Sequence, residues 1–194
     1  MNKGLVTAII VVVVIAIGAI VFMTQGSTGS PNNNATSTAS TLTYDSPELG
    51  IAFSYPNTYK IELQHTDRGH VVVLMDKVAA ANIPVGGEGP PSITVSEFDN
   101  SKNLPLADWI QETPQSNFQL SPDSALNATT LGGKPALAYR HSGLYESDAV
   151  AVEQGDKIFV FAAGWMDQNA QIRKDFQEIL KTVQFSTPQD EPSH

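Results

Sequence analysis

The segment from Leu5 to Met23 carries no charged side chain and consists mainly of Val, Ile and Ala. As a helix with about 1.5 Å of rise per residue it would span roughly 28 Å, close to the hydrocarbon thickness of a bilayer. Because apolar residues cover every face of this helix, it suits lipid better than the core of a small soluble domain. We therefore predict a transmembrane anchor over residues 5–23.

The distribution of basic residues predicts how this anchor is oriented. Lys3 is the only Lys or Arg before Lys60, so the positive-inside rule places residues 1–4 in the cytoplasm and the rest of the chain outside the plasma membrane. A cleaved signal peptide, which would leave a secreted protein, is the alternative. Its apolar region is typically about 7–15 residues long and ends at a small-x-small site. The stretch here is longer, and although residues 26–30 are small, no A-x-A site follows closely, so we favour an uncleaved anchor with the lipid bilayer as its partner.

Composition bounds the rest of the chain. The 194 residues include no cysteine, which excludes a disulfide framework, a thiolate metal site and a cysteine nucleophile. The net charge of −9 argues against nucleic acid and anionic membrane surfaces as main partners. Residues 24–41 are uncharged and rich in Ser, Thr and Asn, which predicts a flexible polar linker. The polar tail 186–194 contains two prolines and is expected to be disordered, which leaves residues 42–185 as one extracytoplasmic domain.

Hydrophobic patterning within this domain predicts short strands and two helices. Strands are expected over residues 51–55, 59–65, 70–75, 93–98, 125–131, 134–141, 148–154 and 157–164. Helices are expected over 105–112 and over 169–182, the second with a single apolar stripe. The pairs Gly132-Gly133 and Gly155-Asp156 each form a two-residue hairpin turn, where glycine supplies a positive φ. The sequence therefore predicts an α+β fold with an antiparallel β-sheet covered by helices.

Three stretches of this pattern resemble a known family. Residues 49–56 read LGIAFSYP, similar to the G-x-x-F-x-Y-P strand of PsbP-like domains. Residues 131–136 resemble the central hairpin of that family, and the strand 157–164 with the helix after it resembles its C-terminal end. The chain is thus identified as a membrane-anchored bacterial version of the Mog1/PsbP type. The resemblance implies an α/β/α sandwich that acts as a non-catalytic binding or assembly module for other envelope proteins or a small ligand. No site residue is transferred from the family.

One cluster of polar residues suggests a metal site. If the strands around residues 66–69 pair as a hairpin, His65 and His70 lie opposite each other with Asp67 above them. Imidazole and carboxylate groups at that spacing can hold Zn²⁺ or a similar divalent metal. Asp and His are also common at polar hairpin tips that bind no metal, which is the competing interpretation. A divalent-metal-binding protein or a metal-dependent hydrolase using these three residues is therefore the alternative function, and no other cofactor is predicted.

A glycine-rich segment contains Gly86, Gly87, Glu88 and Gly89. It matches neither the phosphate-binding P-loop nor a G-x-G-x-x-G turn. Together with residues 79–84 it is interpreted as a long mobile loop. This loop either binds a ligand or partner or is a connection without a binding role.

Other candidate residues have structural and functional interpretations. Trp109 and Trp165 are core or cap residues, or else aromatics that line a ligand groove. Ser142 follows His141, but the sequence offers no nucleophile elbow and no evident orienting acid, so we predict that the protein is not an enzyme. The acidic residues of the hairpin 146–156 are interpreted as a solvated face. These are Glu146, Asp148, Glu153 and Asp156.

Overall fold

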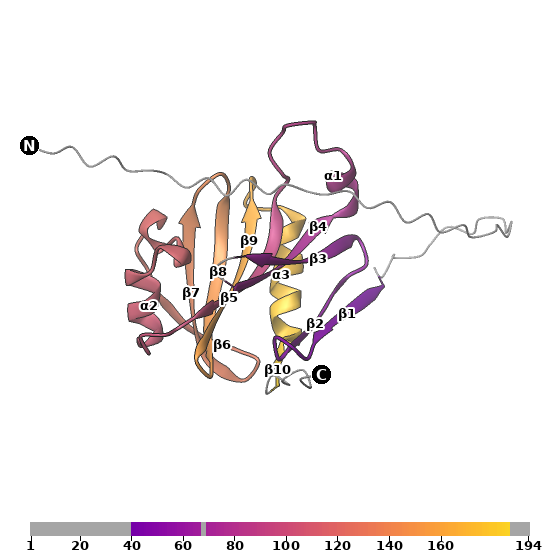
Figure 1. Cartoon of the computed structure of the whole chain (residues 1–194). Coiled ribbons are helices and arrows are strands. Elements are labelled where there is room, and N and C mark those ends of the chain that lie inside the picture. Colours follow the sequence, from indigo (N-terminus) through magenta and orange to yellow (C-terminus); the bar gives the residue numbers. More distant parts are fainter. Residues whose placement is uncertain (1–39, 67–68, 187–194) are drawn as a thin grey trace, which may run out of the picture. The chain divides into compact units, whose positions relative to one another are not determined.

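The computed structural model describes residues 40–66 and 69–186, which form two antiparallel sheets (Figure 1). The larger sheet has seven strands, in the order β3 (Tyr59–Thr66), β4 (Gly69–Asp76), β5 (Ser92–Asp99), β9 (Lys157–Trp165), β8 (Glu146–Gln154), β7 (Lys134–Ser142) and β6 (Asn127–Leu131). The smaller sheet has three, in the order β1 (Thr41–Ser46), β2 (Ile51–Pro56) and β10 (Gln184–Phe185).

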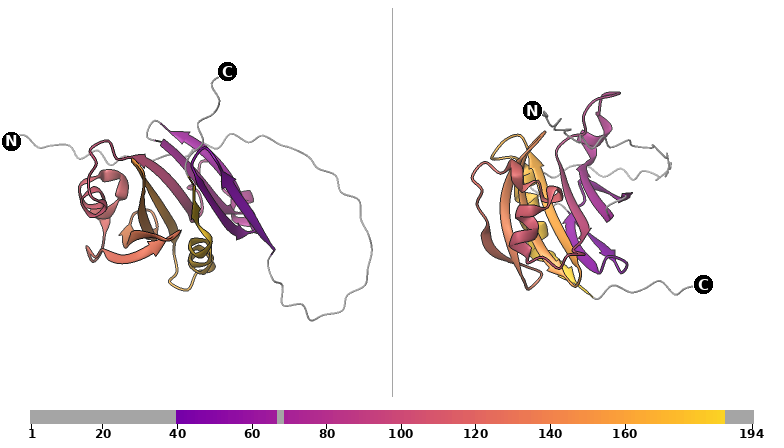
Figure 2. Two further views of the ribbon diagram at one scale, coloured as in Figure 1. Left: turned by 90° about the horizontal axis from the view of Figure 1, so that it is seen from below. Right: turned by 60° about the vertical axis from the view of Figure 1, so that its left-hand side comes forward.

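Helices lie on both faces of the seven-stranded sheet (Figure 2). The helices are α1 (Lys77–Ala81), α2 (Leu106–Glu112) and α3 (Gln171–Thr182), with 3-10 turns at η1 (Pro114–Ser116) and η2 (Phe118–Leu120). Helix α3 and the small sheet cover one face, which we call the α3 face, while α2 and the 3-10 turns cover the other, the α2 face. The predicted antiparallel sheet with helical cover is thus confirmed, and the separate three-stranded sheet is an addition.

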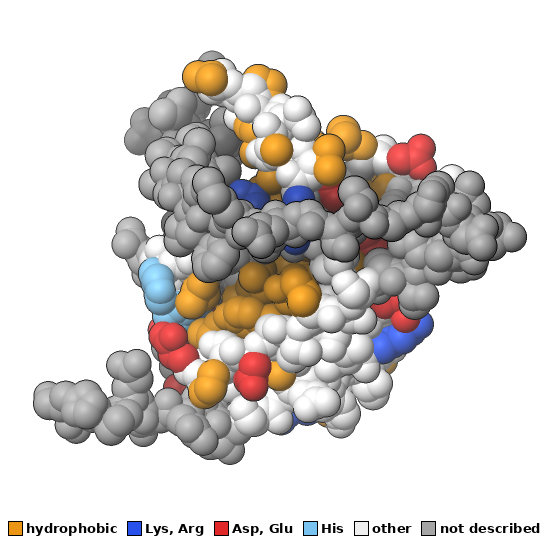
Figure 3. All heavy atoms as spheres, turned by 90° about the vertical axis from the view of Figure 1, so that its right-hand side faces the viewer, with side chains coloured by type: hydrophobic (Ala, Val, Ile, Leu, Met, Phe, Trp, Pro, Cys, Tyr) orange, Lys and Arg blue, Asp and Glu red, His pale blue; other side chains and the backbone are white. Residues whose placement is uncertain are grey.

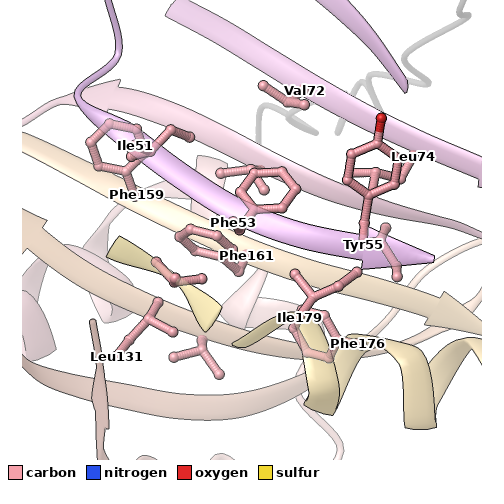
Figure 4. Close-up of a cluster of buried hydrophobic side chains, with 14 of the residues drawn as sticks. Ile51, Phe53, Tyr55, Val72, Leu74, Leu131, Phe159, Phe161, Phe176 and Ile179 are labelled. Carbon is pink, nitrogen blue, oxygen red and sulfur yellow. The ribbon is translucent and has the colours of Figure 1, made fainter. Parts of the chain in front are cut away.

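Each face has its own hydrophobic core. On the α3 face, β2 contributes Ile51, Phe53 and Tyr55, which pack with α3 and with alternate residues of the large sheet (Figure 4). On the α2 face, Trp109 and Ile110 pack on strands β7, β8 and β9. Because strand side chains alternate between faces, β9 is apolar at nearly every position: Phe159 and Phe161 enter the first core, and Ile158 and Val160 enter the second.

The predicted hairpin at Gly132-Gly133 is present between β6 and β7. The φ angles of these glycines are 55° and 78°, in the left-handed region that favours glycine. At Gly132 there is a second constraint, since an added Cβ would lie 2.6 Å from Cδ2 of Phe185 in β10. The turn therefore needs glycine both for its backbone conformation and for the close approach of the small sheet.

Three expectations differ from the structure or lie outside it. Residues 77–81, partly assigned to a long loop, form helix α1, because the Asp76 carboxylate accepts hydrogen bonds from the backbone N–H of Val78 and Ala79. Strand β1 begins at Thr41, one residue before the predicted domain start. The predicted anchor 5–23 lies outside the described residues, within which no helix is long and apolar enough to cross a membrane.

Candidate functional site: a groove beside α3

Helix α3 packs against β2, β5 and β9 and leaves part of the same sheet face open towards β6 and β7. Two cavities lie there, of about 680 Å³ and about 200 Å³, and both are lined by Asp123 and Arg140. We call the two together the α3 groove. The larger cavity is also lined by Glu146, Trp165 and the segment 166–169, and the smaller by Phe176 and Gln177 of α3 and by Asn127 of β6.

Strand register places the charged residues of this groove. Arg140 of β7 pairs with Asp148 of β8, and Glu146 pairs with Trp165 of β9. Alternation along β8 puts Asp148 on the α3 face with Val150. There Arg173 of α3 binds the Asp148 carboxylate in a bidentate manner, with Nε–Oδ2 and Nη2–Oδ1 distances of 2.5 and 2.9 Å. The Asp148 side chain is only 16% exposed, so this ion pair fixes the first part of α3 to the sheet.

Trp165 lies close to two guanidinium groups. Its ring centroid is 4.4 Å from Cζ of Arg173 and 5.5 Å from Cζ of Arg140, distances that allow cation–π attraction. Trp165 is only 4% exposed, so its ring supports the two arginines and leaves little surface for a ligand. Its Nε1 is buried without a hydrogen-bond partner among the described residues, as is Nε of Arg140.

Arg140 is the more exposed of the two arginines that line the groove. Its side chain is 41% exposed, and its ion pair with Glu146 is long at 3.4 Å. Glu146 also accepts a 2.8 Å hydrogen bond from Ser142. Asp123 lines both cavities together with Arg140. The backbone N–H of Ala125 is the main reason that the pKa of Asp123 is lowered, with smaller contributions from the Ser121 hydroxyl and Arg140. The groove thus presents a guanidinium donor beside an ionised carboxylate.

The predicted histidine pair is brought together by the β3–β4 hairpin. His65 and His70 are paired residues, and their rings meet edge to face with centroids 4.9 Å apart. Both ring nitrogens of His70 face carboxylates: Nδ1 is 2.7 Å from Glu97, and Nε2 is 3.5 Å from Glu48. Asp67 lies outside the described residues. Within residues 40–66 and 69–186 no group of three His, Cys, Asp or Glu side chains is arranged to hold a metal ion, and the metal site stays a prediction.

The glycine-rich segment and Trp109 lie away from the α3 groove. Residues 86–89 connect α1 to β5 and line neither cavity, although the Tyr145 hydroxyl donates a 2.6 Å hydrogen bond to the carbonyl of Gly89. Trp109 is buried on the α2 face, 5.6 Å from the ring of Phe98. Of the two tryptophans, only Trp165 therefore lines a groove.

Sequence reasoning missed Arg140 and Arg173, and it misplaced Asp148. The interpretation of Asp148 as part of a solvated face is wrong, because Arg173 binds it and α3 shields it. The register of the predicted β7–β8 hairpin could have revealed part of the site, since it puts Arg140 and Asp148 opposite each other. No sequence signal places Arg173 on that pair, because the contact depends on how α3 crosses the sheet.

Comparison with solved structures identifies the fold. The solution structure of the cyanobacterial PsbP (CyanoP) from Synechocystis sp. PCC 6803 is similar with a TM-score of 0.52, at 15% sequence identity, covering 80% of this chain and 98% of that one. The domain has a PsbP-like fold. This confirms the resemblance inferred from residues 49–56, 131–136 and 157–164. A crystal structure from Bacteroides thetaiotaomicron VPI-5482 matches with a TM-score of 0.47 and 10% identity over 75% of this chain and 48% of that one. No protein-family model and no curated protein matches the sequence.

Proposed function

We propose that this PsbP-like domain is a non-catalytic binding or assembly module, held outside the plasma membrane by the anchor 5–23, and that it binds its partner in the α3 groove. The observation that carries this proposal is the state of Arg140. Its side chain is partly exposed and lines both cavities, its guanidinium lies 5.5 Å from the ring centroid of Trp165, and its ion pair with Glu146 is long. A well-placed but weakly paired arginine is typical of binding surfaces.

The lining of the groove indicates the kind of partner. Arg140 supplies donors, Asp123 and Asp167 supply acceptors, and Gln168 and Asn169 supply both. An extended polar segment of another envelope protein offers complementary groups, since its peptide units carry a carbonyl and an N–H at each residue. The acidic excess of the domain further favours a partner segment with basic side chains.

Photo-crosslinking in cells tests the groove. A photoreactive residue in place of Gln177, which is exposed on α3 and lines the smaller cavity, should capture a discrete partner. The same residue in place of Gln111, exposed on α2, is the matched control on the other face. Adding Arg140→Ala should abolish the product, whereas Lys134→Ala on the same strand should leave it intact. Equal products at both positions, or a product that survives Arg140→Ala, would contradict the groove as the binding site.

Membrane attachment needs its own test. The full chain should float with membranes in a density gradient after carbonate washing, and protease added outside the cells should digest the domain. Recovery of a shortened chain in the medium would support the signal-peptide alternative. Protection of the domain, despite proven access of the protease, would show that the orientation is wrong.

The metal-binding alternative is favoured by one observation, the contact of His65 and His70 beside Glu97. Since carboxylates face both nitrogens of His70, a metal ion would have to displace at least one of them. Metal analysis of the purified protein tests this hypothesis. Stoichiometric zinc that is lost in a His65→Ala, His70→Ala variant would support it. Purification without metal, together with no rise in melting temperature on adding divalent ions, would refute it.

A further inference from the structure

Several large apolar side chains are exposed to solvent at one end of the domain. The four most exposed among the described residues are Val78, Val85, Leu144 and Met166, which we call the apolar tips. Val78 is 72% exposed, Leu144 is 62% exposed, Met166 is 75% exposed, and Val85 is fully exposed. Figure 3 shows apolar side chains standing out over the end of the molecule that carries α1.

Strand register shows that the apolar tips share one end of the large sheet. Val78 and Val85 lie between β4 and β5, Leu144 lies between β7 and β8, and Met166 directly follows β9. The pairs that join these strand ends are Met75 with Ser92, Ile93 with Ala163, Glu146 with Trp165, and Ser142 with Glu146. The hydrogen bond from Tyr145 to Gly89 ties two of the loops together. The four apolar tips therefore lie on loops at the same end of the large sheet.

The N-terminal part of the chain joins the domain at this same end. Ser40, the first described residue, accepts a hydrogen bond from the backbone N–H of Asn57. Asn57 and Thr58 in turn accept hydrogen bonds from Lys77, the first residue of α1, through its Nζ and its backbone N–H. The start of the domain is thus linked to the helix that carries Val78 by direct contacts.

We propose that the apolar tips dock on the lipid surface of the membrane that holds the anchor. This inference rests on the proposed anchoring through residues 5–23. The flexible linker predicted over residues 24–41 has a reach on the order of 20–25 Å, which would keep the end of the domain that carries Ser40 close to the bilayer. Aliphatic side chains on exposed loops gain free energy by entering the interface between headgroups and acyl chains.

The net charge of the domain indicates which lipid headgroups the apolar tips would meet. Outside the anchor and linker the chain has 10 basic side chains, the total of 11 less Lys3, against 20 acidic ones. An acidic domain is repelled by anionic headgroups, so the tips are suited to a zwitterionic surface such as phosphatidylcholine. Docking then depends on the apolar side chains and should be insensitive to salt.

The absence of cysteine makes a site-specific test direct. Full-length protein carrying Val85→Cys is labelled with an environment-sensitive fluorophore and reconstituted in phosphatidylcholine vesicles. We expect the emission of the label to be blue-shifted and to be strongly quenched by lipids that carry a spin label near the headgroup. Aqueous iodide should quench it several-fold less than it quenches the same fluorophore on a soluble peptide. Asp156→Cys, in the exposed turn between β8 and β9 at the opposite end, is the control and should behave as a fully aqueous position.

Two further measurements separate the possible failures. Combining the label at position 85 with Val78→Ser, Leu144→Ser and Met166→Ser should restore aqueous quenching while the chain still floats with the vesicles. A chain that fails to float refutes the anchor. A chain that floats but keeps position 85 as accessible to iodide as position 156 refutes the docking alone. Shielding of position 85 only in native membranes, and not in pure lipid, would overturn the proposal in favour of a protein partner.

Discussion

The two faces of the β7–β8 hairpin carry different kinds of contact. On the α2 face, Tyr139 and Ala149 are buried with Trp109, and the Tyr139 hydroxyl donates a 2.9 Å hydrogen bond to the carbonyl of Ser116. On the α3 face, the neighbouring residues of the same two strands, Arg140 and Asp148, line the groove. The same two strands therefore form a buried core on the α2 face, which we call the sealed face, and an open ionic surface on the α3 face.

This difference separates residues that stabilise the domain from residues that are available for binding. Burial raises the pKa of the Tyr139 hydroxyl, which keeps this group neutral inside the sealed face. Arg140, by contrast, is held by a long ion pair and by the Trp165 ring. We expect substitutions on the sealed face to change the free energy of unfolding, and Arg140 substitutions to change binding.

The largest effect is expected at Trp109. Trp109→Ala removes a buried aromatic side chain and leaves a cavity on the α2 face, which should lower the free energy of unfolding by about 3–5 kcal/mol. Urea denaturation followed by circular dichroism measures this loss. Gln111→Ala on the exposed side of the same helix is the control and should change stability by less than about 0.5 kcal/mol. Similar values for the two variants would contradict the sealed core.

A smaller effect is expected at Asp148, the ionic contact that joins the two regions. Asp148→Ala leaves Arg173 without its bidentate partner in a partly buried position, which should cost about 2 kcal/mol in the same denaturation experiment. Glu178→Ala breaks the exposed pair with Lys181 and should cost less than about 0.5 kcal/mol. If Asp148→Ala is equally mild, Arg173 does not anchor α3 to the sheet.

The sealed face also predicts a dependence on pH. Burial lowers the pKa of His141 below its usual 6.5, although Glu146 opposes the shift. Below about pH 6.5 the unfolded chain therefore binds a proton at this residue more readily than the folded domain does. The free energy of unfolding should fall as pH decreases from 7 to 5, by at most about 1.4 kcal/mol per pH unit from this residue. His141→Gln should flatten that part of the curve, and identical pH profiles for the two proteins would contradict the assignment.

The smallest effect on stability is expected at Arg140. Arg140→Ala should change the free energy of unfolding by less than about 0.5 kcal/mol, because the side chain is exposed and weakly paired. The same variant should lose the crosslinked partner. A loss of stability comparable with that of Asp148→Ala would mean that Arg140 is a structural residue.

The sequence predicted the local structure well and the site poorly. Period-two patterns and glycine turns identified the hairpins, and the stripe at Phe176 and Ile179 identified α3, because these signals depend on neighbours in the chain. Helix α1 was missed, although Asp76 carried a capping signal for it. The α3 groove depends on where α3 crosses the sheet, and that follows from long-range packing of residues such as Phe53 and Phe161, which no local pattern encodes.

Hydrogen exchange in native membranes tests the central claim, that the α3 groove is the binding site, most directly. Amide exchange of the full-length chain would be compared between native membranes and detergent-purified protein. We predict slower exchange in native membranes over residues 121–127 and 170–177, which border the groove, and unchanged exchange over residues 106–120 of the α2 face. Equal exchange in both preparations, or slower exchange confined to residues 106–120, would contradict this account.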